Sequence, residues 1–578
     1  MMSVEGSVKR IGIVYSSSPR LSSHNHMTKL AIIGIDGATY EIIHPMIEAG
    51  ELPNIAKILA EGVSGALESE KPPMTPPAWT SMFTGLNPGK HGVFHFIGRD
   101  LGSYQHSLKN SGSYIGKDIM SLLSKRGLSV GSLSVPMTYP PFEVHDGYMV
   151  SGIPMPLTGD SIAWPPDVCD DMHRILGAGY IADVEYSKYD GDTETSKDDL
   201  SLYSELRDEL FRLEEQRLAI QTNFLRERPT DFYFTVISVT DRCQHYFWKF
   251  QDPNHAGYTE EGAKLYGEVI KDSYRLADKF VGEARAIIGD ETPIALVSDH
   301  GFGPQYHDFH INTWLEQQGY LVRKQVPYLK WGKLHLGGVL HRLGLGFVEK
   351  IIGPLGKIPI YRPRMKKKAD ASDIDWSQTK AFAALHGICV NLQNREPEGI
   401  VSDDDYASTI DEIIIKLRDI KMPDGSVACD GIFKKEEIYS GPRTTEAPDL
   451  QFQMAGLSCI TKECWGESEL FALRKNAPIS GQHRFNGIFA ISKPGVEAGK
   501  VIEGMHIQDT APTLLYAIEQ AVPAWMDGNI RGDIYAEPPE PKWDRSPEPQ
   551  SDLPASSDTD DAQSQSIEDS LRGLGYLQ

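Results

Sequence analysis

The chain has 578 residues, of which 40% are hydrophobic and 24% charged, as is usual for a soluble globular protein. This length allows one large core with insertions or two to three ordinary domains. The formal net charge of −23 excludes a general nucleic-acid binder, which would carry a basic surface. It does not exclude an anionic substrate, because bound metal ions can invert the local field.

The cysteines and the apolar runs bear on the cellular compartment. Six cysteines lie far apart with no CxxC pair, which favours a reducing environment. No run of 18 apolar residues predicts a transmembrane helix, and residues 1–26 lack the apolar segment of a signal peptide. We therefore expect a cytoplasmic protein with a loose extension over residues 1–27. The sequence does not indicate an oligomeric state.

From residue 28 onward, apolar runs alternate with amphipathic stretches, which predicts an α/β fold with a largely parallel sheet flanked by helices. The expected strands cover residues 30–35, 232–239, 294–297, 388–392 and 487–491. The expected helices cover residues 54–61, 201–226, 261–287 and 509–518, the last capped by Asp509.

Two segments depart from this alternation. Residues 321–368 contain twelve lysines and arginines against a single acid, Glu349. We expect either a basic lid over a crevice or a patch that meets anionic lipid headgroups at a membrane surface. The third alternative, a solvated surface insertion, is the one favoured for such a segment. Residues 537–566 are rich in proline, serine and aspartate, which predicts disorder, whereas residues 567–577 have helical spacing and can dock onto the core.

These observations divide the chain into five parts. We expect an extension (1–27), a first core part (28–320), a basic insert or lid (321–377), a second core part (378–536), and a mostly disordered acidic tail with a terminal helix (537–578).

Aspartates follow three of the expected strands. Asp36 follows residues 30–35, Asp241 follows residues 232–239, and Asp299 follows residues 294–297. Because the carboxyl ends of strands in an open α/β sheet converge on one crevice, these carboxylates can meet. Each one alone is also typical of an ordinary turn.

Histidines accompany these aspartates. Asp241 and His245 are one helical turn apart and can face one ion, although such pairs also occur by chance on helix surfaces. Asp299 and His300 lie at a strand end before Gly301, where both can turn toward the crevice. His483 precedes the strand over residues 487–491 and, taken alone, is more typical of a surface histidine.

The segment from Lys71 to Gly85 predicts a turn followed by a short helix, with Pro76 and Pro77 in the first helical turn. Thr75 then lies at a helix N-terminus, where free amides and the helix dipole favour an oxyanion. A threonine there is more often only an N-cap, but metal coordination can make its hydroxyl a nucleophile. Together the candidates form a ligand set suited to Zn²⁺ or Mn²⁺. They are Asp36, Thr75, Asp241, His245, Asp299, His300 and His483.

At these residues the chain resembles the alkaline phosphatase superfamily. It looks closest to the branch of type I phosphodiesterases and nucleotide pyrophosphatases, and within it to the predicted phosphohydrolase/phosphomutase group. The resemblance covers about residues 28–320 and 378–535, and the ending Leu571–Tyr576 is also similar. It implies that Thr75 attacks phosphorus in line, giving a phosphothreonine that water hydrolyses, beside two ions about 4 Å apart. It implies that one ion is held by Asp36, Thr75, Asp299 and His300, and the other by Asp241, His245 and His483.

The chain departs from two patterns within this superfamily. Nucleotide pyrophosphatases place an asparagine shortly after a His-Gly pair, whereas His91-Gly92 is followed by Val-Phe-His-Phe. Sulfatases need a C/S-x-P-x-R motif, which Thr75-Pro-Pro-Ala-Trp79 does not provide. We therefore expect neither nucleotides as the favoured substrates nor a sulfatase as the main activity.

The expected function is a two-metal phosphohydrolase, a phosphodiesterase or a phosphomonoesterase, that acts on a small anionic phosphate ester. A phosphotransferase or mutase is the first alternative, because a second substrate's hydroxyl can replace water at the phosphoenzyme. A non-catalytic scaffold is less favoured, since a structural metal site has no use for a threonine hydroxyl. The candidates for substrate contact, for which structural roles are equally frequent, are Lys90, His91 and His95, with His307 and His310.

Overall fold

The computed structural model describes residues 28–189, 200–324, 371–464, 467–550 and 561–573. The expected N-terminal extension lies outside the described residues, and so does most of the basic insert, with its predicted lid or membrane contact. Within the part of the chain that is described, no helix is long and apolar enough to span a bilayer.

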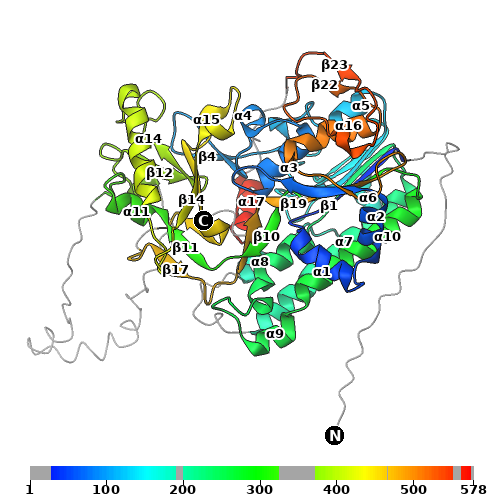
Figure 1. The fold of residues 1–578 in the computed structure, drawn as a ribbon, viewed down its shortest axis with the longest axis horizontal. Coiled ribbons are helices and arrows are strands. Elements are labelled where there is room, and N and C mark those ends of the chain that lie inside the picture. The colour runs from blue at the N-terminus through cyan, green and yellow to red at the C-terminus, as the bar shows by residue number, and fades with distance from the viewer. Residues whose placement is uncertain (1–27, 190–199, 325–370, 465–466, 551–560, 574–578) are drawn as a thin grey trace, which may run out of the picture.

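A mostly parallel sheet forms the centre of the molecule (Figure 1). Strand β1 (Leu30–Ile35) pairs in parallel with β8 (Phe232–Ile237) on one side and with β9 (Ile294–Val297) on the other. All three strands are buried along their whole length, which explains their continuous apolar sequences. The full strand order is β20–β2–β19–β9–β1–β8–β5–β6–β7, with β21 beside β2. The predicted α/β fold with a largely parallel sheet is confirmed.

The other strands of this central sheet lie on either side of these three. They are β2 (Val63–Glu68), β5 (Val130–Val135), β6 (Tyr148–Ser151), β7 (Ala163–Trp164), β19 (Asn486–Ser492), β20 (Lys500–Val501) and β21 (Met505–His506). Only β19 and β7 run antiparallel to their neighbours.

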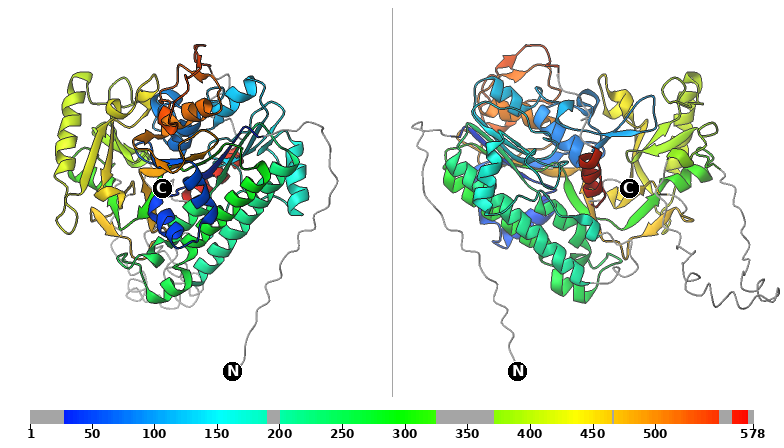
Figure 2. Two further views of the ribbon diagram at one scale, coloured as in Figure 1. Left: turned by 45° about the vertical axis from the view of Figure 1, so that its right-hand side comes forward. Right: turned by 180° about the vertical axis from the view of Figure 1, so that it is seen from behind.

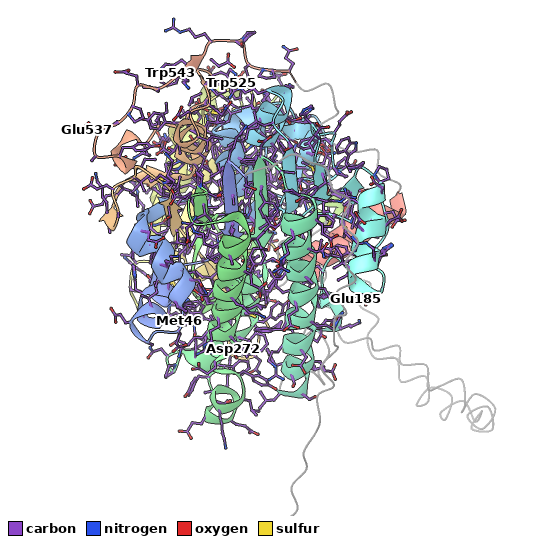
Figure 3. All side chains as sticks on the ribbon, turned by 90° about the vertical axis from the view of Figure 1, so that its right-hand side faces the viewer. Met46, Glu185, Asp272, Trp525, Glu537 and Trp543 are labelled. Carbon is purple, nitrogen blue, oxygen red and sulfur yellow. The ribbon has the colours of Figure 1, made fainter. Side chains whose placement is uncertain are left out.

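Helices cover both faces of the central sheet (Figures 1 and 2). The two longest, α7 (Leu200–Glu227) and α10 (Val269–Ile288), pack side by side, as Figure 3 shows. The helix expected over residues 261–287 is divided at Gly267 into α9 (Glu260–Tyr266) and α10. The same layer contains α1 (Tyr40–Glu48), α2 (Pro53–Glu61) and α8 (Val239–Gln251). The opposite layer contains α3 (Thr75–Thr84), α5 (Ile119–Lys125) and α16 (Thr510–Ala517).

A second sheet with its own hydrophobic cluster lies beside the first, in the order β12–β13–β15–β16–β11–β17, with β14 beside β15. Its strands are β11 (His307–His310), β12 (Ala381–Ala384), β13 (Gly387–Val390), β14 (Cys429–Lys434), β15 (Leu450–Met454), β16 (Cys459–Lys462) and β17 (Phe471–Leu473). It is covered by α11 (Ile311–Gln317) and α14 (Asp403–Arg418). Thus most of the expected second core part forms a separate layer, and only β19 and the residues after it return to the central sheet.

A short antiparallel pair connects the two sheets. Strand β10 (Gly301–Pro304) carries the chain away from β9, and β18 (Gly481–Arg484) brings it back into β19. In this pair Phe302 is opposite His483. The junction therefore brings residues near 300 and 483 together at the end of the central sheet.

The end of the chain returns to the core. Residues 543–544, expected within a disordered tail, form β23 (Trp543–Asp544) and pair with β22 (Val522–Pro523). The terminal helix, α17 (Asp561–Gly573), packs with Ile567 and Leu571 buried.

Candidate active site

The first carboxylates of the site come from the ends of neighbouring parallel strands. Asp36 follows β1 and Asp299 follows β9, and the Gly37 amide donates to Asp299 Oδ1 over 3.2 Å. Asp241 lies in the first turn of α8, directly after β8. The Thr240 hydroxyl donates to the Asp36 carbonyl over 2.6 Å, which ties α8 to the end of β1. The three aspartates therefore meet at the carboxyl end of the sheet.

Two imidazoles approach Asp241 with the same ring atom. His245 Nδ1 lies 3.1 Å from the Gly481 carbonyl oxygen, and His483 Nδ1 lies 2.9 Å from the Pro73 carbonyl oxygen. Each Nδ1 can therefore carry the ring proton, which leaves Nε2 as a lone-pair donor. The two Nε2 atoms lie 3.0 Å apart, and each is 3.5 Å from Asp241 Oδ1.

His300 connects this group with the other carboxylates. Its Nδ1 faces the Gly301 carbonyl oxygen at 3.1 Å, and its Nε2 lies 3.1 Å from Asp299 Oδ2 and 4.0 Å from Asp36 Oδ1. Its ring stacks on the ring of His483 with the centroids 3.5 Å apart. Two clusters with metal-ligand spacing, Asp36–Asp299–His300 and Asp241–His300–His483, thus share one histidine.

Thr75 is the first residue of α3, after the cap residue Met74. Pro76 and Pro77 occupy the first turn, where a missing N–H costs no helical hydrogen bond. The Thr75 Oγ1 lies 3.3 Å from His300 Nε2. The N-terminus of α3 therefore presents this hydroxyl to the cluster of carboxylates and imidazoles.

The side chains of the site are buried, and three of them are neighbouring carboxylates. The seven predicted residues are between 0 and 4% exposed. One oxygen of each of Asp36, Asp241 and Asp299 has no hydrogen-bond partner among the described residues. Burial, followed by repulsion from Asp299 and Asp241, raises the pKa of Asp36 well above its usual range. Orphaned carboxylate oxygens beside imidazole lone pairs fit divalent cations, because a cation would satisfy both.

Three residues that the sequence analysis missed support this cluster. The Trp79 Nε1–H donates to Asp36 Oδ2 over 3.3 Å, and Arg242 Nη1 donates to Asp241 Oδ2 over 2.6 Å. Arg242 also pairs with Asp183. Arg242 follows Asp241 directly in the sequence, which is a usable signal. Asp183 lies in an irregular segment far upstream, where no motif marks it.

The predicted substrate contacts lie in several places. Lys90 Nζ pairs with Asp527 Oδ1 at 2.5 Å, and the His91 ring lies 3.0 Å from the Ser81 hydroxyl, contacts that fit the structural alternative for both. His95 is buried, with its ring 5.4 Å from that of His386. His307 and His310 lie in β11 of the second sheet, where His310 Nδ1 meets the Glu469 carbonyl oxygen.

Comparison with known protein families identifies the family of the chain. The model of the type I phosphodiesterase/nucleotide pyrophosphatase family matches residues 30–451, which is well over half of the chain. The chain belongs to this family. No curated protein sequence matches it. The resemblance to the alkaline phosphatase superfamily is confirmed.

Solved structures show the same fold at low sequence identity. Phosphonoacetate hydrolase from Sinorhizobium meliloti 1021, in complex with phosphonoacetate, is similar with a TM-score of 0.50 and 14% identity, over 85% of this chain and 95% of that chain. Human ectonucleotide pyrophosphatase/phosphodiesterase 5 has a TM-score of 0.47 and 12% identity, over 88% of this chain and 100% of that chain. The family and the fold identify this phosphodiesterase-family chain as a phosphoric ester hydrolase of a metal-dependent family.

Proposed function

We propose that this phosphodiesterase-family protein hydrolyses small anionic phosphate esters through a phosphothreonine formed on Thr75, with two divalent cations, Zn²⁺ or Mn²⁺, at the site. The observation that carries the proposal is the buried Thr75 hydroxyl, 3.3 Å from His300 Nε2 and beside three carboxylates with unsatisfied oxygens. A purely structural metal site would not need a hydroxyl at this point.

The residues divide into two sets of ligands. Asp36, Thr75, Asp299 and His300 would hold one cation, and Asp241, His245 and His483 would hold the other. When bound, such cations lower the pKa of a ligating hydroxyl and stabilise the entering and leaving oxygens of an in-line displacement. The positions of the donor atoms support this division, because His245 and His483 both turn Nε2 toward Asp241.

The protein's own groups prepare Thr75 for attack. Because His300 Nδ1 faces the Gly301 carbonyl oxygen, its Nε2 lone pair is turned toward the Thr75 hydroxyl, where both groups would bind the same cation. Because Pro76 and Pro77 have no N–H and the Ala78 amide bonds the Met74 carbonyl, the Thr75 backbone amide is the donor that the start of α3 would offer to the phosphoryl oxygens. Burial of the hydroxyl keeps bulk water away from it.

The same burial supports phosphoryl transfer as the second candidate function. Excluding water prolongs the life of a phosphoenzyme and favours the hydroxyl of another molecule as acceptor. Glycerol added to the assay separates the two functions. A transferase releases less inorganic phosphate than p-nitrophenol, whereas a hydrolase releases the two in equal amounts.

The test compares the wild type with Thr75→Ala and Thr75→Ser on p-nitrophenyl phosphate and bis-p-nitrophenyl phosphate. Each protein is stripped with a chelator and reloaded with Zn²⁺ or Mn²⁺. We expect metal-dependent turnover that Thr75→Ala lowers by about 10³-fold or more, and that Thr75→Ser partly retains. Full activity of Thr75→Ala would refute the nucleophile, and the preferred ester distinguishes diesterase from monoesterase.

A further inference from the structure

Behind the metal-ligand cluster, a buried arginine connects Asp241 to another carboxylate. Arg242 Nη1 donates to Asp241 Oδ2 over 2.6 Å, and Arg242 Nη2 donates to Asp183 Oδ2 over 3.2 Å. All three side chains are buried. Because the guanidinium occupies Oδ2, the Asp241 oxygen turned toward His245 and His483 is Oδ1. A planar guanidinium can hold both carboxylates at once in a fixed orientation, unlike a lysine ammonium.

Asp183 is itself held in place by its neighbours. Its Oδ1 accepts from the Val184 amide over 2.8 Å and from the Tyr186 hydroxyl over 3.0 Å. The Tyr186 ring stacks on Tyr246 of α8, and Arg217 of α7 donates to the Ala182 carbonyl over 2.8 Å. Residues 182–184 and Tyr186 thus form a buried support behind α8.

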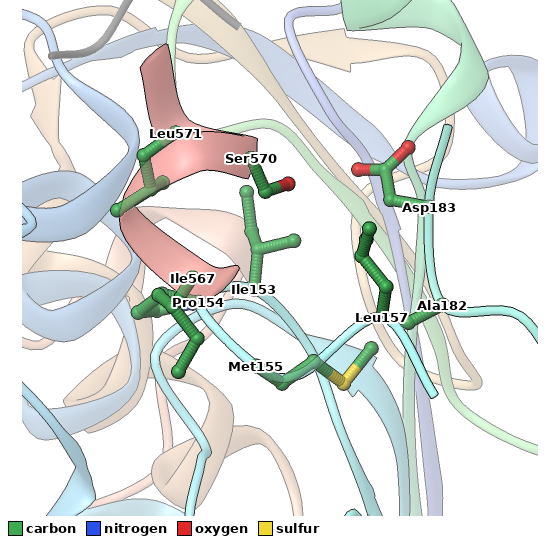
Figure 4. Close-up of a pocket in the computed structure, with 9 residues that line it drawn as sticks. All are labelled: Ile153, Pro154, Met155, Leu157, Ala182, Asp183, Ile567, Ser570 and Leu571. Carbon is green, nitrogen blue, oxygen red and sulfur yellow. The ribbon is translucent and has the colours of Figure 1, made fainter. Parts of the chain in front are cut away.

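The C-terminal helix closes over this support. Figure 4 shows α17 facing the segment that carries Ala182 and Asp183, with a small pocket between them. Ile567 and Leu571 of α17 are buried there, and both line the pocket together with Asp183. The C-terminal helix is therefore packed against the segment whose Asp183 holds Arg242, the partner of Asp241.

We propose that Arg242 and Asp183 are positioning residues for the metal site at Asp241, and that the docking of α17 onto residues 182–184 keeps them in place. The inference rests on the proposed function, because it assumes that Asp241 binds a cation. Arg242 fixes the rotation of the Asp241 carboxylate, Asp183 fixes Arg242, and α17 excludes water from the pair. Supporting groups of this kind typically contribute about 10–100-fold to metal affinity.

The test is calorimetric titration of the metal-free, full-length protein with Zn²⁺ and with Mn²⁺. Arg242→Lys keeps the charge but cannot bridge two carboxylates in fixed geometry, and Asp183→Asn weakens the same link without removing a side chain. Leu571→Asp undocks α17. The matched controls are Arg228→Lys, whose arginine pairs with Asp167 and Asp171 on another helix, and Gln565→Asp on the exposed side of α17. We expect one of two binding steps to weaken about 10–100-fold in the three test variants and to change less than about twofold in both controls.

Each outcome separates this inference from the proposed function. If the wild type binds no cation, the proposed function fails. The positioning role is overturned, while the proposed function stands, if the wild type binds two cations and both variants bind them at least as tightly. The two variants in question are Arg242→Lys and Asp183→Asn. If only Leu571→Asp binds like the wild type, the role of α17 is overturned. Near-ultraviolet circular dichroism of the metal-free variants checks folding, and Asp183→Asn decides the matter should Arg242→Lys misfold.

Discussion

The substitution Asp36→Asn should stabilise the metal-free protein and remove its stabilisation by metal. In the metal-free fold, burial and the charges of Asp299 and Asp241 raise the pKa of Asp36. A carboxyl group whose folded pKa lies above its unfolded value of about 3.9 stabilises the fold fully below that pH. This contribution is lost as the pH rises toward the folded pKa, by up to about 1.4 kcal/mol per pH unit. Asparagine carries no such penalty at neutral pH.

The size of the two effects follows from the same site. An asparagine amide oxygen can still accept the Trp79 Nε1–H bond, so the substitution removes the charge and keeps the contact. We expect the free energy of unfolding of the metal-free variant to exceed that of the metal-free wild type by at least about 1 kcal/mol at pH 7. Conversely, a cation at 100 times its dissociation constant stabilises the wild type by about 2.7 kcal/mol for each site. The variant should lose this gain at the site that Asp36 helps to form.

Urea unfolding of both proteins, in a chelator and in excess Zn²⁺ or Mn²⁺, measures whether the order of their stabilities reverses when metal is added. The variant should be the more stable protein in chelator and the less stable one in metal. A variant that is less stable in chelator would refute the argument from like-charge burial. A variant that gains as much from metal as the wild type would refute the assignment of Asp36 as a ligand.

Three further predictions concern the neighbours of the ligands. Trp79→Phe removes the donor to Asp36, and we expect about a tenfold lower kcat/KM with a smaller change in melting temperature; unchanged kinetics would show that the bond is dispensable. Gly34→Ala places a Cβ 2.5 Å from Trp79 Cη2, which should lower the free energy of unfolding by about 1–3 kcal/mol, as thermal melting would show, unless the indole moves freely. Burial lowers the pKa of His245 to about 3, so its ring should stay neutral in the metal-free protein when NMR follows it from pH 7 to about 4. Because the pKa of His245 is lower in the fold than in the unfolded chain, His245 destabilises the fold as the pH falls below its unfolded pKa. Protonation of its ring near pH 6 would contradict this prediction.

The central sheet, and the meeting of the candidate ligands at its end, were predictable from the sequence because strand ends carry strong local signals. Asp36 and Asp299 directly follow fully buried strands, and parallel pairing of those strands places them side by side. Asp241 and His245 share one face of α8 by helical spacing alone. His483 precedes strand β19, as predicted, and it also lies within β18, where pairing with β10 brings its ring against that of His300.

The supporting residues were not predictable because their roles depend on long-range packing. Asp183 lies in an irregular segment, and only the folding of α7, α8 and α17 around it buries its carboxylate beside Arg242. Trp79 looks like an ordinary core residue of α3 until its indole N–H is seen to face Asp36. Lys90 and His91 remain candidate substrate contacts, with a structural role equally open, and in the structure Lys90 pairs with Asp527 while the His91 ring lies beside the Ser81 hydroxyl.

The candidate ligands lie at the junction of the two sheets. His300 lies where the chain leaves the central sheet, and His483 lies where it returns, with β10 and β18 paired between them. One oxygen of each of the three buried carboxylates has no hydrogen-bond partner among the described residues. A cation that binds both histidine-bearing segments would close the junction and relieve the repulsion in one event. We therefore expect metal binding, catalysis and the mutual orientation of the two sheets to depend on the same few side chains.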